Sequence, residues 1–385
     1  MKTFDVVIIG AGLAGLQCAK LLSQHGVKIL LVDRKHDISK GVHTTGIFVR
    51  KTFEDFDFPI GTLSKPISSV TLYSPKLKSF NLKSEKDEFR IGNMGLLYKA
   101  SLQECLENGV EFLGGARYVS SHAIDDTSKT LVKFEKQSKE ITAKTKVLIG
   151  ADGAKSNVAR DLNLDENKEW IVGYEEVYQG VPDEPHLHCF LNAKLAPGYL
   201  AWIANDGVES HIGVGGYTSR FNPREAYKVF NSKVAPYFID LENSELKETR
   251  GGRIPVGGIL KRIANERGLL IGDAAGAVSP LTAGGLDPCM RLSKFAAEIV
   301  LERLKSNEAK VLLKYSGEMF RQKFATRLLM RWSLRTFSYQ PLLEFAFKFL
   351  RIGIGRKFAE KVFFRRASFP NVKKLKIEKF SQESG

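Results

Sequence analysis

Two kinds of hydrophobic pattern alternate along the chain. Mostly apolar runs that end in glycine or aspartate are typical of buried parallel strands, and they lie at residues 6–9, 28–32, 146–149 and 268–271. Runs that alternate with polar positions and end at turn residues indicate antiparallel strands, and they lie at 69–73, 186–191, 198–204 and 211–215. From Leu286 onward the spacing is mainly helical. We therefore expect an α/β unit, α+β overall, with an inserted antiparallel sheet and a C-terminal helical segment.

A glycine cluster follows the first apolar run. Residues 10–15 read Gly-Ala-Gly-Leu-Ala-Gly, and residues 16–22 have helical composition. In such a turn the first glycine bends the chain, the second admits a pyrophosphate to bare backbone, and the third lets the helix pack closely on the strand. Asp33 follows about twenty residues later, where a carboxylate accepts hydrogen bonds from a ribose. These features predict a Rossmann-like dinucleotide site, with NAD and FAD both open at this point.

Two further clusters lie where later strands end. They are Gly150-Ala151-Asp152-Gly153 and Gly272-Asp273-Ala274-Ala275-Gly276. Together with the first cluster they resemble the flavoproteins of the para-hydroxybenzoate hydroxylase fold, in which all three motifs hold FAD. Residues 272–286 resemble the geranylgeranyl reductase family, although Ser279 and Ala283 stand where that family has an asparagine and a glycine. The resemblance covers most of residues 1–305 and implies FAD as the cofactor.

The resemblance also implies roles for individual residues. Asp273 is expected on the ribityl or pyrophosphate part of FAD, with a helix N-cap as the alternative role. Backbone N–H groups near Leu286 are expected to face the flavin ring, where a helix start favours negative charge on a reduced flavin. The predicted cofactor-binding residues are Gly10, Gly12, Leu13, Ala14, Gly15, Asp33, Arg34, Thr45, Gly46, Asp152, Gly272, Asp273, Pro280, Gly284, Gly285 and Leu286.

The hydrophobic patterns along the chain also predict three regions. An FAD-binding domain is predicted at 1–65, 90–165 and 264–305. It is interrupted by an antiparallel-sheet substrate domain at 66–89 and 166–263. Residues 306–385 form the predicted basic, aromatic-rich helical C-terminal region.

Composition limits the class of protein. The chain has 385 residues, 43% of them hydrophobic, which supports a large core and excludes wholesale disorder. Its four cysteines are scattered without a CxxC pair, so we expect reduced thiols, a cytoplasmic setting and no metal site. We also expect neither a secretory signal nor a membrane-spanning helix.

The net charge of +15 is concentrated near the C-terminus. Residues 321–379 hold sixteen lysines and arginines against three acidic residues, interleaved with large aromatic side chains. Arg327, Arg331 and Arg335 would stack three cations on one helix face without an acid to relieve them. This pattern favours contact with an anionic membrane surface, whereas the alternative is a helical cap packed on the flavin domain. No nucleic-acid motif accompanies the charge, so we expect no nucleic-acid partner.

Aromatic residues indicate the substrate site. Geranylgeranyl reductases carry a Tyr-x-Trp-x-Phe motif that faces the flavin, and this chain has Tyr199 and Trp202, with one extra residue between them. Residues three apart on a strand point to opposite faces, so either a bulge restores the facing or only one of them lines the pocket. We predict an apolar small-molecule or lipid substrate beside Tyr199 and Trp202.

No catalytic residue is assigned from the sequence. An unpolarised double bond needs a proton as well as a hydride, and His43, Tyr199 and ordered water are the candidate donors. His43 and Thr44 occupy the flavin-side loop where the family often has a cysteine, so no cysteine role carries over. Arg90 is the candidate substitute for an arginine that commonly contacts FAD near the next helix.

The first functional hypothesis is an FAD-dependent reductase that saturates double bonds of an isoprenoid or other long apolar substrate, with NAD(P)H as transient electron source. An FAD-dependent monooxygenase of an aromatic or lipid substrate and a non-redox flavin-dependent cyclase are the alternatives. A halogenase is not expected, because residues 201–204 lack the Trp-x-Trp-x-Ile-Pro signature. The oligomeric state is left open.

Overall fold

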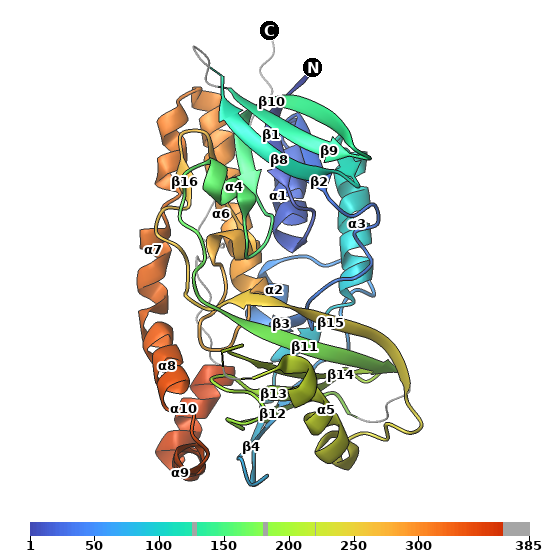
Figure 1. Cartoon of the computed structure of the whole chain (residues 1–385), viewed down its shortest axis with the longest axis vertical. Coiled ribbons are helices and arrows are strands. Elements are labelled where there is room, and N and C mark those ends of the chain that lie inside the picture. The colour runs from blue at the N-terminus through green and yellow to red at the C-terminus, as the bar shows by residue number, and fades with distance from the viewer. Residues whose placement is uncertain (125–128, 180–183, 220, 365–385) are drawn as a thin grey trace.

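The computed structural model of the protein describes residues 1–124, 129–179, 184–219 and 221–364. Two large β-sheets follow one another along its long axis, and helices from the C-terminal region run along one side of both (Figure 1). A small sheet of β3 (Ile47–Val49) and β6 (Phe89–Ile91) lies between them in this view, next to α2 (Arg50–Asp55).

The first sheet is mainly parallel and lies at the end of the molecule that carries the N-terminus (Figure 1). Its strand order is β16–β17–β10–β1–β2–β7, and β9 pairs with both β10 and β8. Its strands are β1 (Lys2–Ile9), β2 (Ile29–Asp33), β7 (Glu111–Gly114), β8 (Arg117–Ala123), β9 (Thr130–Lys136), β10 (Lys139–Gly150), β16 (Ala264–Asn265) and β17 (Gly268–Leu270). Strands β2, β1, β10 and β17 run parallel, so their carboxyl ends meet at one edge. The three glycine clusters begin at that edge.

Helices cover this sheet through apolar faces. α1 (Leu13–Ser23) packs on β1 and β2 and also contacts α3 (Met94–Glu107) and α6 (Leu286–Ser306). Nearly all of α1 is buried, which suits its alanine, leucine and cysteine content. Short α4 (Asn157–Asp161) follows β10.

The second sheet is antiparallel except for the pair β12 and β4. Its order is β15 (Glu245–Pro255), β11 (Trp170–Gln179), β14 (Glu209–Gly216), β13 (Ala201–Asn205), β12 (His186–Phe190), β4 (Ser69–Tyr73) and β5 (Ser79–Lys83). Helix α5 (Pro223–Lys233) covers one face, where Phe230 packs against Ile212 and Val214. Trp202 and His211 belong to the other face because side chains alternate along a strand. The predicted α+β class is thereby confirmed.

The C-terminal region forms a series of helices. These are η3 (Ala309–Lys314), α7 (Gly317–Arg321), η4 (Gln322–Phe324), α8 (Ala325–Thr336), α9 (Gln340–Leu350) and α10 (Gly353–Phe363), while η1 (Ala235–Tyr237) and η2 (Gly272–Ala275) occur earlier. Phe347 of α9 is buried against Phe80 of β5, with ring centroids 6.5 Å apart. Among the described residues, no helix is long and apolar enough to cross a membrane. Residues 365–379 of the predicted basic tail lie outside the described residues.

The three arginines of α8 all have partners in the rest of the protein, although Arg335 is itself exposed. Arg331 is buried and donates to the carbonyl oxygens of Gly198, Pro280 and Leu281. Arg327 donates to the Ser279 hydroxyl at 2.9 Å. Arg335 pairs with Glu169 at 3.2 Å. The expectation of three cations without a relieving acid is therefore wrong for Arg335, while the partners of Arg327 and Arg331 are neutral groups, a hydroxyl and carbonyl oxygens from segments far away in sequence.

Candidate active site

A cavity of about 1210 Å³ is lined by residues of both sheets, the flavin-side loop and the C-terminal helices. Of the sixteen predicted cofactor-binding residues, all except Gly15 and Pro280 line it, as do Tyr199 and Trp202. Predicted cofactor-binding residues up to 276 positions apart in the sequence, from Gly10 to Leu286, thus meet around one space. The volume exceeds the range of about 300–1,000 Å³ typical of drug-sized ligands, so the cavity has room for a dinucleotide and part of a second molecule.

The two exceptions have packing roles. A Cβ atom on Gly15 would lie 1.9 Å from the carbonyl oxygen of Gly10, so this glycine lets α1 lie close to the end of β1. The carbonyl of Pro280 accepts a hydrogen bond of 2.6 Å from Nε of Arg331. Both residues support neighbours that line the cavity.

The first glycine cluster has the geometry expected for a phosphate turn. Gly10 has φ +104°, and a Cβ atom there would lie 2.2 Å from the carbonyl oxygen of Ala151. A Cβ atom on Gly12 would meet no atom of the described part of the chain within 4 Å. Gly12 precedes the first turn of α1, which no side chain caps. Open space beside free N–H groups at a helix N-terminus suits an anionic ligand.

Asp33 and Asp152 are held by backbone groups. The carboxylate of Asp33 accepts hydrogen bonds of 2.8 Å from the N–H groups of Ala11 and Lys35. The carboxylate of Asp152 accepts from Ser156 Oγ and from the N–H groups at the start of α4. Asp152 therefore orders this loop, and both aspartates still line the cavity.

Asp273 differs from these two aspartates. Among the described residues its carboxylate accepts no hydrogen bond, and it caps neither η2 nor another helix. Burial raises the pKa of this carboxyl to about 6. A ligand hydroxyl at this point would supply the missing donor, so the geometry favours the cofactor role over the N-cap role.

The loop before α6 leaves backbone donors facing the cavity. Gly285 is the N-cap of α6, and no side chain among the described residues caps this N-terminus. Gly284, Gly285 and Leu286 all line the cavity. Ala283 has φ +51°, a left-handed conformation that favours glycine, and it stands where the family has a glycine. Ala283 thus has a backbone conformation that glycine adopts more easily than alanine.

The flavin-side loop lines the cavity as predicted, whereas Arg90 does not. His43, Thr45 and Gly46 line the cavity. Burial, with Lys35 and Arg34 nearby, lowers the pKa of His43, so this imidazole is neutral at pH 7 and is a poor acid. Arg90 does not line the cavity; its guanidinium pairs with Asp87 at 2.6 Å. The suggested substitution of Arg90 for an FAD-binding arginine thus has no geometric support.

Tyr199 and Trp202 both reach the cavity without a bulge. Strand β13 begins at Ala201, so Tyr199 precedes the strand, and the alternation of side chains between the two faces of the sheet does not apply to it. Their ring centroids are 6.4 Å apart. Gly213 and Gly215 on the facing strand make room for the rings, because a Cβ atom there would lie 2.3 Å from Trp202 and 2.8 Å from Tyr199. Tyr199 donates its hydroxyl to the carbonyl of Thr282 at 2.8 Å.

A buried polar cluster under the cavity was missed in the sequence. Oε2 of Glu175 accepts hydrogen bonds from the Thr45 hydroxyl and, at 2.8 Å, from Nε1 of Trp202. Oε1 of Glu175 lies 3.6 Å from Nδ1 of His211 and 3.4 Å from Nη1 of Arg250. The available signals were a glutamate inside an apolar strand run and a histidine at an inward strand position.

The electrostatics of this cluster favour a charged pair. Burial alone would lower the pKa of His211, but Asp206 and Glu175 raise it to about 9. Burial alone would raise the pKa of Glu175, but His211 and Arg250 hold it below its usual range. At pH 7 the pair is therefore an imidazolium beside a carboxylate.

The four cysteines are free and buried. Cys189 and Cys289 line the cavity. Burial raises the pKa of Cys189 to about 12, so its thiol stays protonated at pH 7. Neither geometry nor charge prepares a thiolate here.

Two family models and several curated proteins match this chain. The FAD binding domain family model matches residues 97–331, and the pyridine nucleotide-disulphide oxidoreductase model matches residues 4–178. Digeranylgeranylglycerophospholipid reductase 2 of Methanopyrus kandleri is 28% identical over 79% of this chain and 78% of its own length. The digeranylgeranylglycerophospholipid reductase of Sulfolobus acidocaldarius is 29% identical over 79% of this chain and 70% of its own length.

Solved structures share the fold. A geranylgeranyl bacteriochlorophyll reductase-like protein of Thermoplasma acidophilum superposes with a TM-score of 0.82 at 17% identity, covering 95% of this chain and 97% of the other. A flavin-dependent brominase gives a TM-score of 0.63 at 16% identity, covering 87% and 90%.

The chain belongs to the FAD binding domain family, whose model matches more than half of it. With the curated relatives above, the predicted resemblance is confirmed, and the protein is a geranylgeranyl reductase-like FAD-dependent oxidoreductase.

Proposed function

We propose that the protein reduces carbon–carbon double bonds of an isoprenoid lipid, with NAD(P)H as the electron source. The main support for this proposal is that one continuous cavity runs from the glycine clusters past Trp202 to an apolar end, which is lined by Leu72, Leu187, Leu350 and Phe363. An aromatic monooxygenase substrate would not need such an extended apolar end. The names of the curated relatives support a lipid of this class.

The placement that we propose for FAD has a single direction along the cavity. We propose that its adenosine lies beside Asp33, its pyrophosphate at Gly12 and its ribityl chain at Asp273, with the flavin ring next to residues 284–286. Open space at Gly12 and the unpartnered carboxyl of Asp273 support this placement. When bound, FAD supplies the hydride chemistry. Tyr199 and Trp202 would hold an alkene beside it and exclude water.

The lipid is proposed to arrive from an anionic membrane surface. Phe358 of α10 lines the cavity and is 45% exposed, so the cavity meets the surface beside this helix. Exposed apolar side chains continue over α8 to α10, and they are Leu329, Trp332, Phe337, Tyr339, Leu342, Phe345, Phe349, Ile352 and Ile354. Lys348, Arg351 and Lys357 are exposed beside them. Rings and cations together suit an anionic bilayer interface.

Anaerobic turnover tests the reaction. Holoenzyme reduced under argon is mixed with an unsaturated isoprenoid phospholipid or its saturated analogue. Flavin reoxidation with the unsaturated lipid alone, and a product two hydrogens heavier per double bond, is expected. Stoichiometric oxygen consumption would instead indicate a monooxygenase, and an isomerised product with flavin still reduced would indicate a cyclase.

Vesicle flotation tests the surface. Replacing Phe345 and Ile354, which are 70% and 76% exposed, by serine should weaken binding to anionic vesicles. Ile60→Ser, at a fully exposed apolar residue outside these helices, is the matched control. Equal flotation of all three proteins would contradict the proposed membrane contact.

A further inference from the structure

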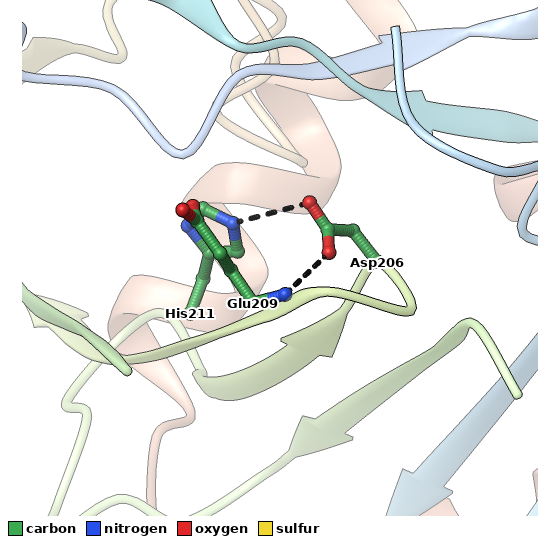
Figure 2. Close-up of side chains that lie close together, drawn as sticks. All are labelled: Asp206, Glu209 and His211. Carbon is green, nitrogen blue, oxygen red and sulfur yellow. Dashed lines mark hydrogen bonds and ion pairs between the residues drawn. The ribbon is translucent and has the colours of Figure 1, made fainter. Parts of the chain in front are cut away.

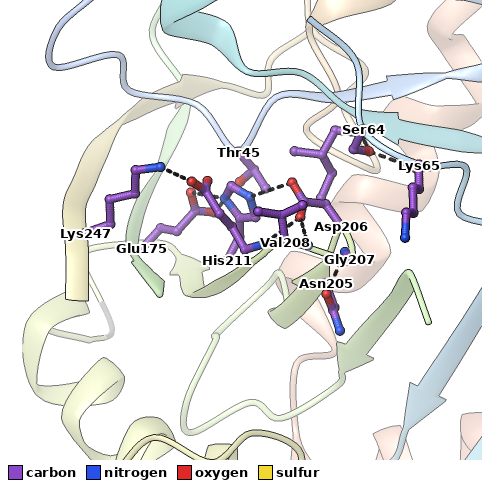
Figure 3. Close-up of polar contacts among 12 residues, drawn as sticks. Thr45, Ser64, Lys65, Glu175, Asn205, Asp206, Gly207, Val208, His211 and Lys247 are labelled. Carbon is purple, nitrogen blue, oxygen red and sulfur yellow. Dashed lines mark hydrogen bonds and ion pairs between the residues drawn. The ribbon is translucent and has the colours of Figure 1, made fainter. Parts of the chain in front are cut away.

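The Glu175–His211 pair connects the cavity with the protein surface. On the cavity side, Glu175 lines the space and is held by Thr45 and Trp202. On the other side, Nε2 of His211 points toward Asp206, with 4.0 Å between Nε2 and Oδ2 (Figure 2). The side chain of Asp206 is 13% exposed. Asp206, His211 and Glu175 lie in a row (Figure 3), with Asp206 partly exposed to solvent and Glu175 in the cavity lining.

Nε2 of His211 is the unusual atom in this row. It is buried and has no hydrogen-bond partner within the part of the chain that the structure describes. Buried polar atoms nearly always have a partner, so an orphan calls for a functional explanation. The carboxylate of Asp206 accepts from the N–H groups of Val208 and Glu209 through Oδ1, which leaves Oδ2 facing the imidazole. A shift of about 1 Å would bring Oδ2 into hydrogen-bond range.

The charges around His211 favour a proton over a metal cation. Glu209 brings a third potential ligand atom within 4.8 Å, but its carboxylate is paired with Lys247 (Figure 3). Arg250 faces the pair from β15, with Nη1 3.4 Å from Nδ1 of His211, and is itself paired with Glu248. Lys247 and Arg250 thus already place fixed positive charge beside the cluster, which disfavours a divalent ion.

We propose that His211 and Glu175 form the route by which a proton reaches the substrate, an inference that rests on the proposed function. Reduction of one double bond breaks the π bond and forms two C–H bonds, one from the hydride that reduced FAD supplies and one from a proton. His211 passes that proton from Nδ1 to Oε1 of Glu175, and the carboxyl of Glu175 releases it into the cavity. Solvent restores it on the side of Asp206. One proton is drawn from solvent per double bond, so atoms and charge balance.

The first test compares full-length Glu175→Gln and His211→Gln holoenzymes with wild type. Reoxidation of the anaerobically reduced enzyme by an unsaturated isoprenoid phospholipid should slow at least about a hundredfold in both, which is the usual contribution of a positioned acid. FAD affinity and reduction by dithionite should stay within about twofold of wild type, because the substitutions remove no predicted cofactor contact. His188→Gln is the control, since His188 lies in the same sheet but does not line the cavity.

The second test needs neither cofactor nor substrate. Histidine NMR of the protein without FAD should show His211 charged up to about pH 9, and Glu175→Gln should move its titration to lower pH. If the wild-type enzyme reduces no lipid, the proposed function is wrong. If His211 is neutral at pH 7, the proposed proton route is wrong whatever the function.

Three other results would overturn the route. They are wild-type reoxidation rates in Glu175→Gln, a parallel loss of FAD affinity and reoxidation, and a stoichiometric metal ion bound at Asp206.

Discussion

Gly12 and Gly15 lie three residues apart in one motif, and the structure gives them opposite consequences when each is replaced by alanine. At Gly15 the new Cβ atom would lie 1.9 Å from the carbonyl oxygen of Gly10, well inside the closest approach of real Cβ atoms. α1 must then move by about 1 Å or more away from β1, and overpacking of this kind costs about 1–3 kcal/mol. Gly15→Ala should therefore destabilise the protein without FAD.

At Gly12 the new methyl group meets no atom of residues 1–124, 129–179, 184–219 and 221–364 within 4 Å, and the backbone angles, φ −78° and ψ −174°, are allowed for alanine. The free energy of unfolding without FAD should change by less than about 1 kcal/mol. The methyl group would stand where the pyrophosphate is proposed to approach the backbone. FAD should bind about ten- to a hundredfold more weakly, which corresponds to about 1.4–2.7 kcal/mol.

Urea unfolding of the FAD-free proteins and fluorescence titration with FAD measure the two effects separately. Wild-type FAD affinity in Gly12→Ala would refute a phosphate at this backbone. Wild-type stability in Gly15→Ala would refute the close helix–strand packing that the structure assigns to this residue.

Four further results are expected. Asp273→Asn should stabilise the FAD-free protein by about 3 kcal/mol at pH 8 but not at pH 4, because burial raises the pKa of this carboxyl to about 6 and disfavours its ionised form above that pH. The same substitution should lower the affinity for FAD. The pKa of His211 is about 9 in the folded protein and near 6.5 in the unfolded chain, so its charged form stabilises the fold by about 3 kcal/mol below pH 6.5. This stabilisation is lost as the pH rises through 9. In His211→Gln the free energy of unfolding in urea should therefore vary less between pH 6.5 and 9. Arg331→Met should leave three carbonyls unpaired, lower stability by about 3 kcal/mol and speed proteolysis of α8. Ala283→Gly should stabilise by about 1 kcal/mol in thermal melts, since it relieves a positive φ.

The sequence was sufficient for the parts of the site that rest on local backbone geometry. A glycine or aspartate directly after a buried strand has a nearly fixed place in a parallel sheet, so the three clusters could be placed at one edge before any coordinates. Trp202 and Tyr199 were predicted from a motif of the family that the chain resembles, and the start of β13 at Ala201 was needed to explain how both reach the cavity.

The rest depended on contacts between distant segments. Nothing near Arg331 reveals that its partners are the carbonyls of residues 198, 280 and 281, so its charge favoured a membrane-facing helix face with unrelieved cations instead. Glu175 and His211 are likewise unremarkable singly. They become a site only because the register of β11 against β14 brings them together and a loop places the Thr45 hydroxyl on the carboxylate of Glu175.

An experimental structure of the protein with FAD tests the central claim most directly. The account predicts a single extended FAD, with adenosine beside Asp33, ribityl chain at Asp273 and flavin ring between residues 284–286 and Trp202. An FAD bound in the reverse direction, or outside the cavity that these residues line, would contradict it.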